Sequence, residues 1–69
     1  MDPRDIFQGT TPQWHPNGQE PRLVIVVDYL PMGGSFLVMD RGRPRSVPWD
    51  RVIFDELDAS VIIARAQGE

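Results

Sequence analysis

Residues 22–49 read RLVIVVDYLPMGGSFLVMDRGRPRSVPW. Leu23–Val27 form an apolar run rich in β-branched side chains, which predicts a strand that is buried on both faces. Residues 31–34 then place two adjacent glycines after a proline, and glycine readily adopts the positive φ angles of a tight reversal. Ser35–Met39 read as the returning strand. The stretch therefore predicts a β-hairpin.

A second turn follows this hairpin. Residues 40–44 read DRGRP, and this combination of glycine and proline is typical of a chain reversal. The short segment Arg45–Val47 favours a third strand. Three strands joined by short turns predict an antiparallel meander.

Residues 49–67 allow two interpretations. They contain no glycine or proline, and several apolar side chains recur near helical spacing, which favours a helix over about 49–67 that Gly68 would end. The β-branched side chains of the same stretch favour short strands instead. We favour a turn at Pro48–Arg51, a strand from Val52 and a last strand at Ser60–Arg65, with an acidic loop between the strands.

The favoured fold class is mainly β: a small four- or five-stranded meander or SH3-like barrel with an extended N-terminal arm. Gly42–Val52 read GRPRSVPWDRV and resemble the closing stretch of SH3-like barrels, where a proline turn precedes the last strand. PRC-barrel domains have a similar turn. The resemblance implies a barrel shape, and no ligand-binding residues of SH3 domains are carried over. The alternative is an α+β fold, in which a three-stranded sheet is followed by the C-terminal helix.

Residues 1–21 differ in composition from the rest of the chain. Four of the seven prolines and two of the six glycines lie there, which disfavours a helix or a central strand. Ile6, Phe7 and Trp14 are large apolar side chains that need either the domain or a partner to pack against. We therefore divide the chain into a Pro-rich extended arm at 1–21 and a single small β-rich domain at 22–69.

The chain has 69 residues and no cysteine, so a single small core without disulfides has to stabilise it. Self-association commonly supplements such a core, and we expect a homo-oligomer. The N-terminus lacks the pattern of a signal peptide and no apolar run approaches the length of a membrane span, so we expect a cytoplasmic protein without membrane contact. All seven basic residues are arginine, a bias that indicates a GC-rich bacterial or phage genome.

Few side chains in this sequence could catalyse a reaction. The single histidine, His15, lies in the arm, where its imidazole would lack the fixed geometry that a catalytic base needs. The acidic residues at 55–58 lack the ligand pattern of a calcium loop. Gly33 and Gly34 have no neighbouring lysine to complete a phosphate loop. We therefore expect neither an enzyme nor a bound cofactor or metal.

The strongest candidate for binding is a basic segment with neighbouring aromatic side chains. Residues 41–51 carry a local charge of +3, although the whole chain carries −3. Alternation along a strand would place three of the arginines on one face, where they could bind carboxylates or phosphates. Core packing for Trp49 and a charged strand edge for the arginines are the competing explanations. The predicted partner-binding residues are Arg41, Arg43, Arg45, Arg51, Trp49 and Trp14.

These features predict a small protein–protein interaction module that recognises an acidic surface on a partner protein. It would be an accessory or inhibitory factor, encoded by a phage or mobile element, that binds a host protein. Two alternatives use the same observations. One is a small-barrel nucleic-acid-binding protein with an Arg/Trp patch, and the other is a structural component of a larger assembly that the arm laces together.

Overall fold

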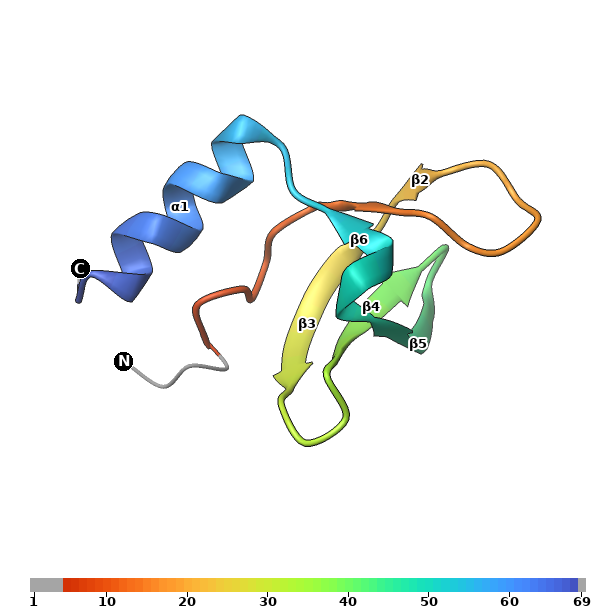
Figure 1. The fold of residues 1–69 in the computed structure, drawn as a ribbon, viewed down its shortest axis with the longest axis horizontal. Helices are drawn as coiled ribbons and strands as arrows, with labels where there is room; N and C mark the ends of the chain where they lie inside the picture. Colours follow the sequence, from red (N-terminus) through yellow and green to blue (C-terminus); the bar gives the residue numbers. More distant parts are fainter. Residues whose placement is uncertain (1–4, 69) are drawn as a thin grey trace.

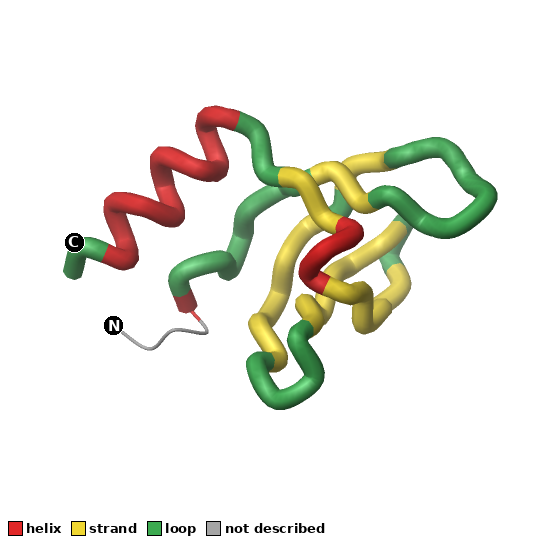
Figure 2. Tube along the Cα trace, viewed as in Figure 1, coloured by secondary structure: helices red, strands yellow, loops and turns green. Residues whose placement is uncertain are grey.

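The computed structural model describes residues 5–68 of the chain (Figure 1). The strands gather into one body, and the helix lies beside the N-terminal arm, away from the strands (Figure 2). In chain order the elements are β1 (Gln13–Trp14), β2 (Arg22–Leu23), β3 (Ile25–Leu30), β4 (Ser35–Asp40), β5 (Arg43–Pro48), a 3-10 helix (Trp49–Arg51), β6 (Val52–Ile53) and α1 (Glu56–Ala66).

Strands β3, β4 and β5 form an antiparallel meander, as the sequence predicts. Inner-face side chains lie directly opposite each other, Val26 with Val38 and Phe36 with Val47. Both predicted turns are present between these strands. In the first turn Gly34 has a φ of 62°, a conformation that glycine adopts without the penalty a Cβ would bring.

The strand predicted at Leu23–Val27 is buried on one face only, so the expectation of burial on both faces is wrong. Val24 and Val26 are 2% and 1% exposed, whereas Leu23 and Ile25 are 70% and 51% exposed. The side chains alternate between core and solvent because no second layer covers the outer side of these strands within residues 5–68. The segment is also divided between two sheets, since β2 and β3 pair with different strands.

The arm supplies a strand to the second, smaller sheet, whose order is β2-β1-β6. Gln13 in β1 lies opposite both Leu23 and Ile53. Upstream of β1 the arm follows β3, since the backbone N–H of Val26 donates to the carbonyl of Thr10 over 2.9 Å. The proline content had disfavoured a central strand here, but a strand of only two residues fits between two prolines.

The two sheets do not close into a barrel. On one side β2 leads directly into β3, which joins the sheets, but no strand pairing connects β5 with β6 within residues 5–68. The 3-10 helix Trp49–Arg51 separates these two strands, at the place where the sequence predicts a turn. The mainly β class is therefore confirmed, whereas a closed SH3-like barrel is not.

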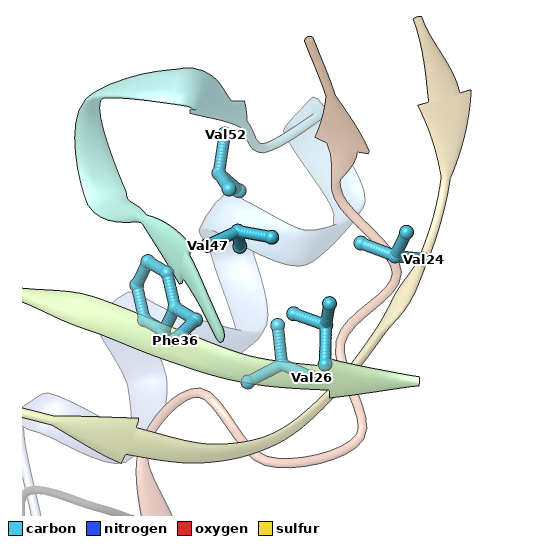
Figure 3. Packing of buried hydrophobic residues seen from close by; sticks show 6 residues of the cluster. Val24, Val26, Phe36, Val47 and Val52 are labelled. Carbon is cyan, nitrogen blue, oxygen red and sulfur yellow. The ribbon is translucent and has the colours of Figure 1, made fainter. Parts of the chain in front are cut away.

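The core is small and lies on the inner face of the strands (Figure 3). Valine dominates it, because stiff β-branched side chains pack well on a pleated surface. The buried apolar residues are Val24, Val26, Phe36, Val38, Val47 and Val52. Larger side chains pack around this centre and remain partly exposed, namely Phe7, Trp14, Tyr29 and Phe54. Most of the aromatic surface therefore lies at the margin of the core.

The strand predicted at Ser60–Arg65 is wrong, because these residues belong to α1. Asp55 caps this helix: its side chain accepts a hydrogen bond from the backbone N–H of Asp58 over 2.8 Å, and acidic side chains in the first turn interact favourably with the helix dipole. The helical alternative was right in kind, although the helix begins only at Glu56, after β6. Gly68 follows it with a φ of 88°. Within residues 5–68 no helix is long and apolar enough to cross a membrane.

Polar contacts attach α1 to the arm. The backbone N–H of Thr11 donates to Oδ2 of Asp58 over 3.2 Å. At the other end of α1, Nη1 of Arg65 donates over 3.3, 3.1 and 2.7 Å to the backbone carbonyls of Asp5, Ile6 and Gln8. No residue of α1 is buried, so these hydrogen bonds, more than apolar packing, position the helix.

Candidate binding site

A buried carboxylate, Asp40, binds two arginines at the end of β4. Its side chain is 4% exposed. Arg22 donates from Nε to Oδ1 and from Nη2 to Oδ2, both over 2.7 Å, which is the bidentate geometry of a strong charge-assisted pair. Nε of Arg45 lies 3.0 Å from Oδ2. Arg45, one of the predicted partner-binding residues, therefore connects β5 to β4 and β2 within the fold.

The electrostatics of this cluster favour the charged forms of Asp40 and Arg22. The hydrogen bond from Arg22 lowers the pKa of Asp40, and the nearby guanidinium charges lower it further, although burial acts in the opposite direction. The same hydrogen bond raises the pKa of Arg22. Because neither group changes its protonation near neutral pH, the cluster acts as a fixed ion network.

Trp14 lies against the two arginines of this cluster. The Cζ atom of Arg22 is 4.7 Å from the centroid of the indole ring, and that of Arg45 is 5.6 Å away, within the range of cation–π interactions. The ring is also partly buried against the core. Two of the six predicted binding residues, Trp14 and Arg45, thus contact each other inside the chain.

The remaining predicted arginines are exposed and lie in different places. Arg41 occupies the turn between β4 and β5 with a φ of 53°, so it does not continue the strand alternation. Arg43 and Arg45 lie two residues apart on β5 and share a face. Arg51 ends the 3-10 helix and lines a small hollow beside the arm. The four arginines therefore come from a turn, a strand and a 3-10 helix, and Arg41 does not lie on the β5 face that Arg43 and Arg45 share.

A pocket of about 470 Å³ opens between the arm, the β3–β4 hairpin and the segment that follows β5. We term it the aromatic pocket. The segments that line it are distant in sequence, so only the folded chain assembles it. Its lining residues are Phe7, Tyr29, Phe36, Trp49, Asp50, Val52 and Phe54.

The inner wall of the aromatic pocket consists of rings that pack against one another. The centroid of Phe7 lies 5.1 Å from that of Phe36 and 5.3 Å from that of Tyr29. Phe36 and Phe54 are 5.7 Å apart. These tilted and edge-on pairs have favourable quadrupole geometry. Ring packing therefore forms the pocket in the free protein.

Trp49 forms the exposed rim of the aromatic pocket, so the competing explanation of core packing is wrong for this residue. It is 62% exposed. Its backbone N–H donates to the carbonyl of Gly34 over 3.0 Å, and a Cβ on Gly34 would come within 3.3 Å of Cδ1 of the indole. The close approach at this glycine sets where the ring stands above the hairpin turn.

Among residues 5–68, Asp50 is the one charged side chain that lines the aromatic pocket. Within residues 5–68 no group of histidine, cysteine and acidic side chains gathers as metal ligands. His15 lies in the arm, where Nε2 is 3.1 Å from Oε1 of Gln13. The rings of the aromatic pocket can bind an apolar group of a ligand, and Asp50 can pair with a cation of the same ligand.

A comparison with protein families, with curated proteins and with solved structures finds no match for this chain. No family therefore supplies a function or a set of site residues.

The aromatic pocket could not be predicted from the sequence. Tyr29, Phe36 and Phe54 are single aromatic positions in different segments, and no spacing relates them. For the wall of the pocket Phe7 gave the one signal, because a large apolar side chain in the arm needed something to pack against. Asp40 and Arg22 were missed as a pair for the same reason, since 18 positions separate them in the chain.

Proposed function

We propose that this protein is a small non-enzymatic protein–protein interaction module whose aromatic pocket binds an apolar side chain of a partner. The observation that carries the proposal is Trp49, which is 62% exposed at the rim of a pocket with a packed aromatic wall. Leaving so large a ring in water forgoes the stabilisation of burial. Tryptophan is also enriched among the residues that dominate binding at protein interfaces.

The charges at the aromatic pocket favour a partner segment of particular chemistry. Asp50 would accept a hydrogen bond from a lysine or arginine beside the apolar anchor. Arg51 is exposed on the same 3-10 helix and would contact an acidic group of the partner. The acidic partner surface expected from the sequence would therefore contact Arg41, Arg43 and Arg51. Arg45 is left out because it is paired with Asp40.

The proposal retains two further expectations. An SH3-like arrangement is supported by the strand order, in which β6, β1 and β2 lead into β3, β4 and β5, and by the 3-10 helix before β6. A phage- or mobile-element-encoded factor that regulates or inhibits a host protein in the cytoplasm is supported by small size and arginine bias. Binding at the aromatic pocket requires neither.

The test is a selection from a displayed random peptide library on the immobilised protein and on its Trp49→Ala variant. We expect the wild type to enrich segments with an apolar or aromatic residue beside a basic one. Trp49→Ala should weaken their binding by about 30-fold or more, the loss typical of a hot-spot residue. Leu57→Ala is the matched control, since Leu57 is 77% exposed but lies on α1, and it should bind like the wild type.

Equal binding by the wild type and by Trp49→Ala would contradict the proposal, provided that circular dichroism shows both to be folded. A pull-down from lysate, with and without nuclease and at two salt concentrations, addresses the nucleic-acid alternative. Retention of nucleic acid that falls steeply with salt would favour the alternative hypothesis, a small-barrel nucleic-acid-binding protein. A protein partner retained at raised salt would support the interaction module.

A further inference from the structure

A second apolar surface lies on the outer side of the strands, away from the core. Leu23, Ile25 and Ile53 are 70%, 51% and 56% exposed. Gln13 lies opposite both Leu23 and Ile53, so these three residues form one row across β2-β1-β6. Ile25 lies opposite Met39 in the neighbouring sheet. We term Leu23, Ile25, Met39 and Ile53 the outer patch.

Leu23 stands as a ridge between two hollows in this surface. A hollow of about 620 Å³ is lined by Leu23, Met39 and Arg41 among others. A hollow of about 180 Å³ is lined by Leu23, Ile53 and Asp55 among others. The outer patch therefore has an exposed cation at one end and an exposed carboxylate at the other.

We propose that the outer patch binds a second copy of this chain in a two-fold symmetric dimer. In such a dimer the same surface of each copy faces the other. With the axis beside Leu23, the Leu23 ridge of each copy enters the larger hollow of the other. Arg41 of one copy then faces Asp55 of the second copy. Symmetry makes each contact twice, so the charges at both ends are balanced.

The placement of the charges favours a second copy over an unrelated partner. A self-complementary surface requires opposite charges at opposite ends, whereas an unrelated partner imposes no such relation. Within the part of the chain that the structure describes, Arg41 and Asp55 are the only charged residues that line the two hollows. The net charge of −3 on the whole chain is therefore located elsewhere and does not oppose pairing at the patch.

The size of the molecule supports the same occupant. A core of six buried apolar residues stabilises a small chain only modestly, and burial of the outer patch would add to it. The two hollows share no residue with the aromatic pocket, so the dimer presents two free pockets.

Sedimentation equilibrium of the purified chain over a concentration series tests the dimer. The wild type should dimerise, and Leu23→Asp should raise the dimer Kd by about 30-fold or more, because it places a carboxylate at the centre of the interface. Leu57→Asp is the matched control: the side chain is equally exposed and the change is the same, but the position is on α1. Circular dichroism confirms that each variant is folded.

A double-mutant cycle tests the contact between Arg41 and Asp55. Arg41→Glu sets carboxylates against each other and should weaken the dimer about 10-fold. Asp55→Asn removes one charge and keeps the helix cap, because asparagine is an equally good cap. Adding it to Arg41→Glu should restore part of the lost affinity. Arg43→Glu makes the same charge change outside the hollows and serves as the control.

A monomer at every concentration would overturn the proposal. A dimer that both Leu23→Asp and Arg41→Glu leave intact would also overturn it, and so would a dimer lost in Leu57→Asp but kept in Leu23→Asp. None of these outcomes depends on the peptide selection, because Trp49 lies outside the outer patch.

Discussion

Trp14 and Trp49 are residues of the same type in two different environments. Trp14 is partly buried against the core, and two guanidinium groups lie 4.7 and 5.6 Å from its ring centroid. Trp49 is 62% exposed and borders an open pocket. The Trp14 ring contacts other residues of this chain, whereas most of the Trp49 surface is open to a partner.

The difference depends on the carboxylate near each ring. Asp40 is 4% exposed and collects Arg22 and Arg45, which cover Trp14. Asp50 is exposed, and within residues 5–68 it forms no ion pair with an arginine, so it holds no guanidinium over Trp49. A tryptophan near arginines is therefore structural where a buried carboxylate gathers those arginines, and it is available for binding where none does.

Replacing the buried carboxylate should have the largest effect on stability. The amide of Asp40→Asn keeps the shape but cannot balance the charges of Arg22 and Arg45, and one of its acceptor positions becomes a donor. We expect the melting temperature, followed by circular dichroism, to fall by roughly 10 °C. Asp50→Asn is the control at an exposed carboxylate. Equal shifts in the two variants would remove the distinction between the two sites.

Truncation of the two tryptophans should affect stability and binding in opposite ways. Trp14→Ala should lower the free energy of unfolding by about 2 kcal/mol, because it leaves a gap beside the core. Trp49→Ala should change it by less than about 0.5 kcal/mol and should weaken peptide binding instead. Denaturant unfolding and the peptide assay measure the two effects. A larger stability loss for Trp49→Ala would reverse our assignment.

Acid should remove the contribution of Asp40 gradually. Its pKa is lower in the folded chain than the value of about 3.9 in an unfolded one, so the unfolded chain takes up the proton first as pH falls. The stabilisation is therefore complete above about pH 5 and is lost progressively as the pH falls below that value. Denaturant unfolding from pH 6 to 2 should give a steeper slope for the wild type than for Asp40→Asn. Parallel curves would contradict the assigned ion network.

The smallest expected effect is a difference in stability between variants of the two arginines on the same face of β5. Arg45 is 53% exposed and pairs with Asp40, so Arg45→Ala should lower the free energy of unfolding by less than about 1 kcal/mol, as expected for a partly solvated ion pair. Arg43→Ala removes an exposed guanidinium and should leave stability unchanged. Denaturant unfolding of both variants measures the difference. A greater loss for Arg43→Ala would place the structural contact at the wrong arginine.

Local signals predicted the meander correctly. The turns at 31–34 and 40–44 depend on glycine and proline, whose backbone preferences act without help from distant residues. The C-terminal stretch was harder, because the β-branched side chains at 61–63 suggested a strand. Asp55 and the acids after it decide for a helix through capping and the helix dipole. The sequence contained that signal, but propensity and capping pointed in opposite directions.

The binding residues were only partly predictable. Trp49 and the arginines were recognised as candidates by residue type. In the structure Arg45 pairs with Asp40, whereas Trp49 and the other predicted arginines are exposed. Phe7 needed a partner by its size, yet its contact with Phe36 joins positions far apart in the chain. No periodic pattern relates such positions. Sequence reasoning therefore named the rim of the aromatic pocket and missed its wall.

The sequence by itself determined the β3-β4-β5 meander, its turns and the chemical types available for binding, because backbone preferences and side-chain chemistry are local properties. Only the tertiary structure decided which groups remain available. Burial of Asp40 engages Arg22 and Arg45, and these cover Trp14, whereas the turn at Gly34 holds Trp49 at the surface. Exposure and pairing depend on neighbours that are distant in the chain, and for that reason they emerge only when the chain is folded.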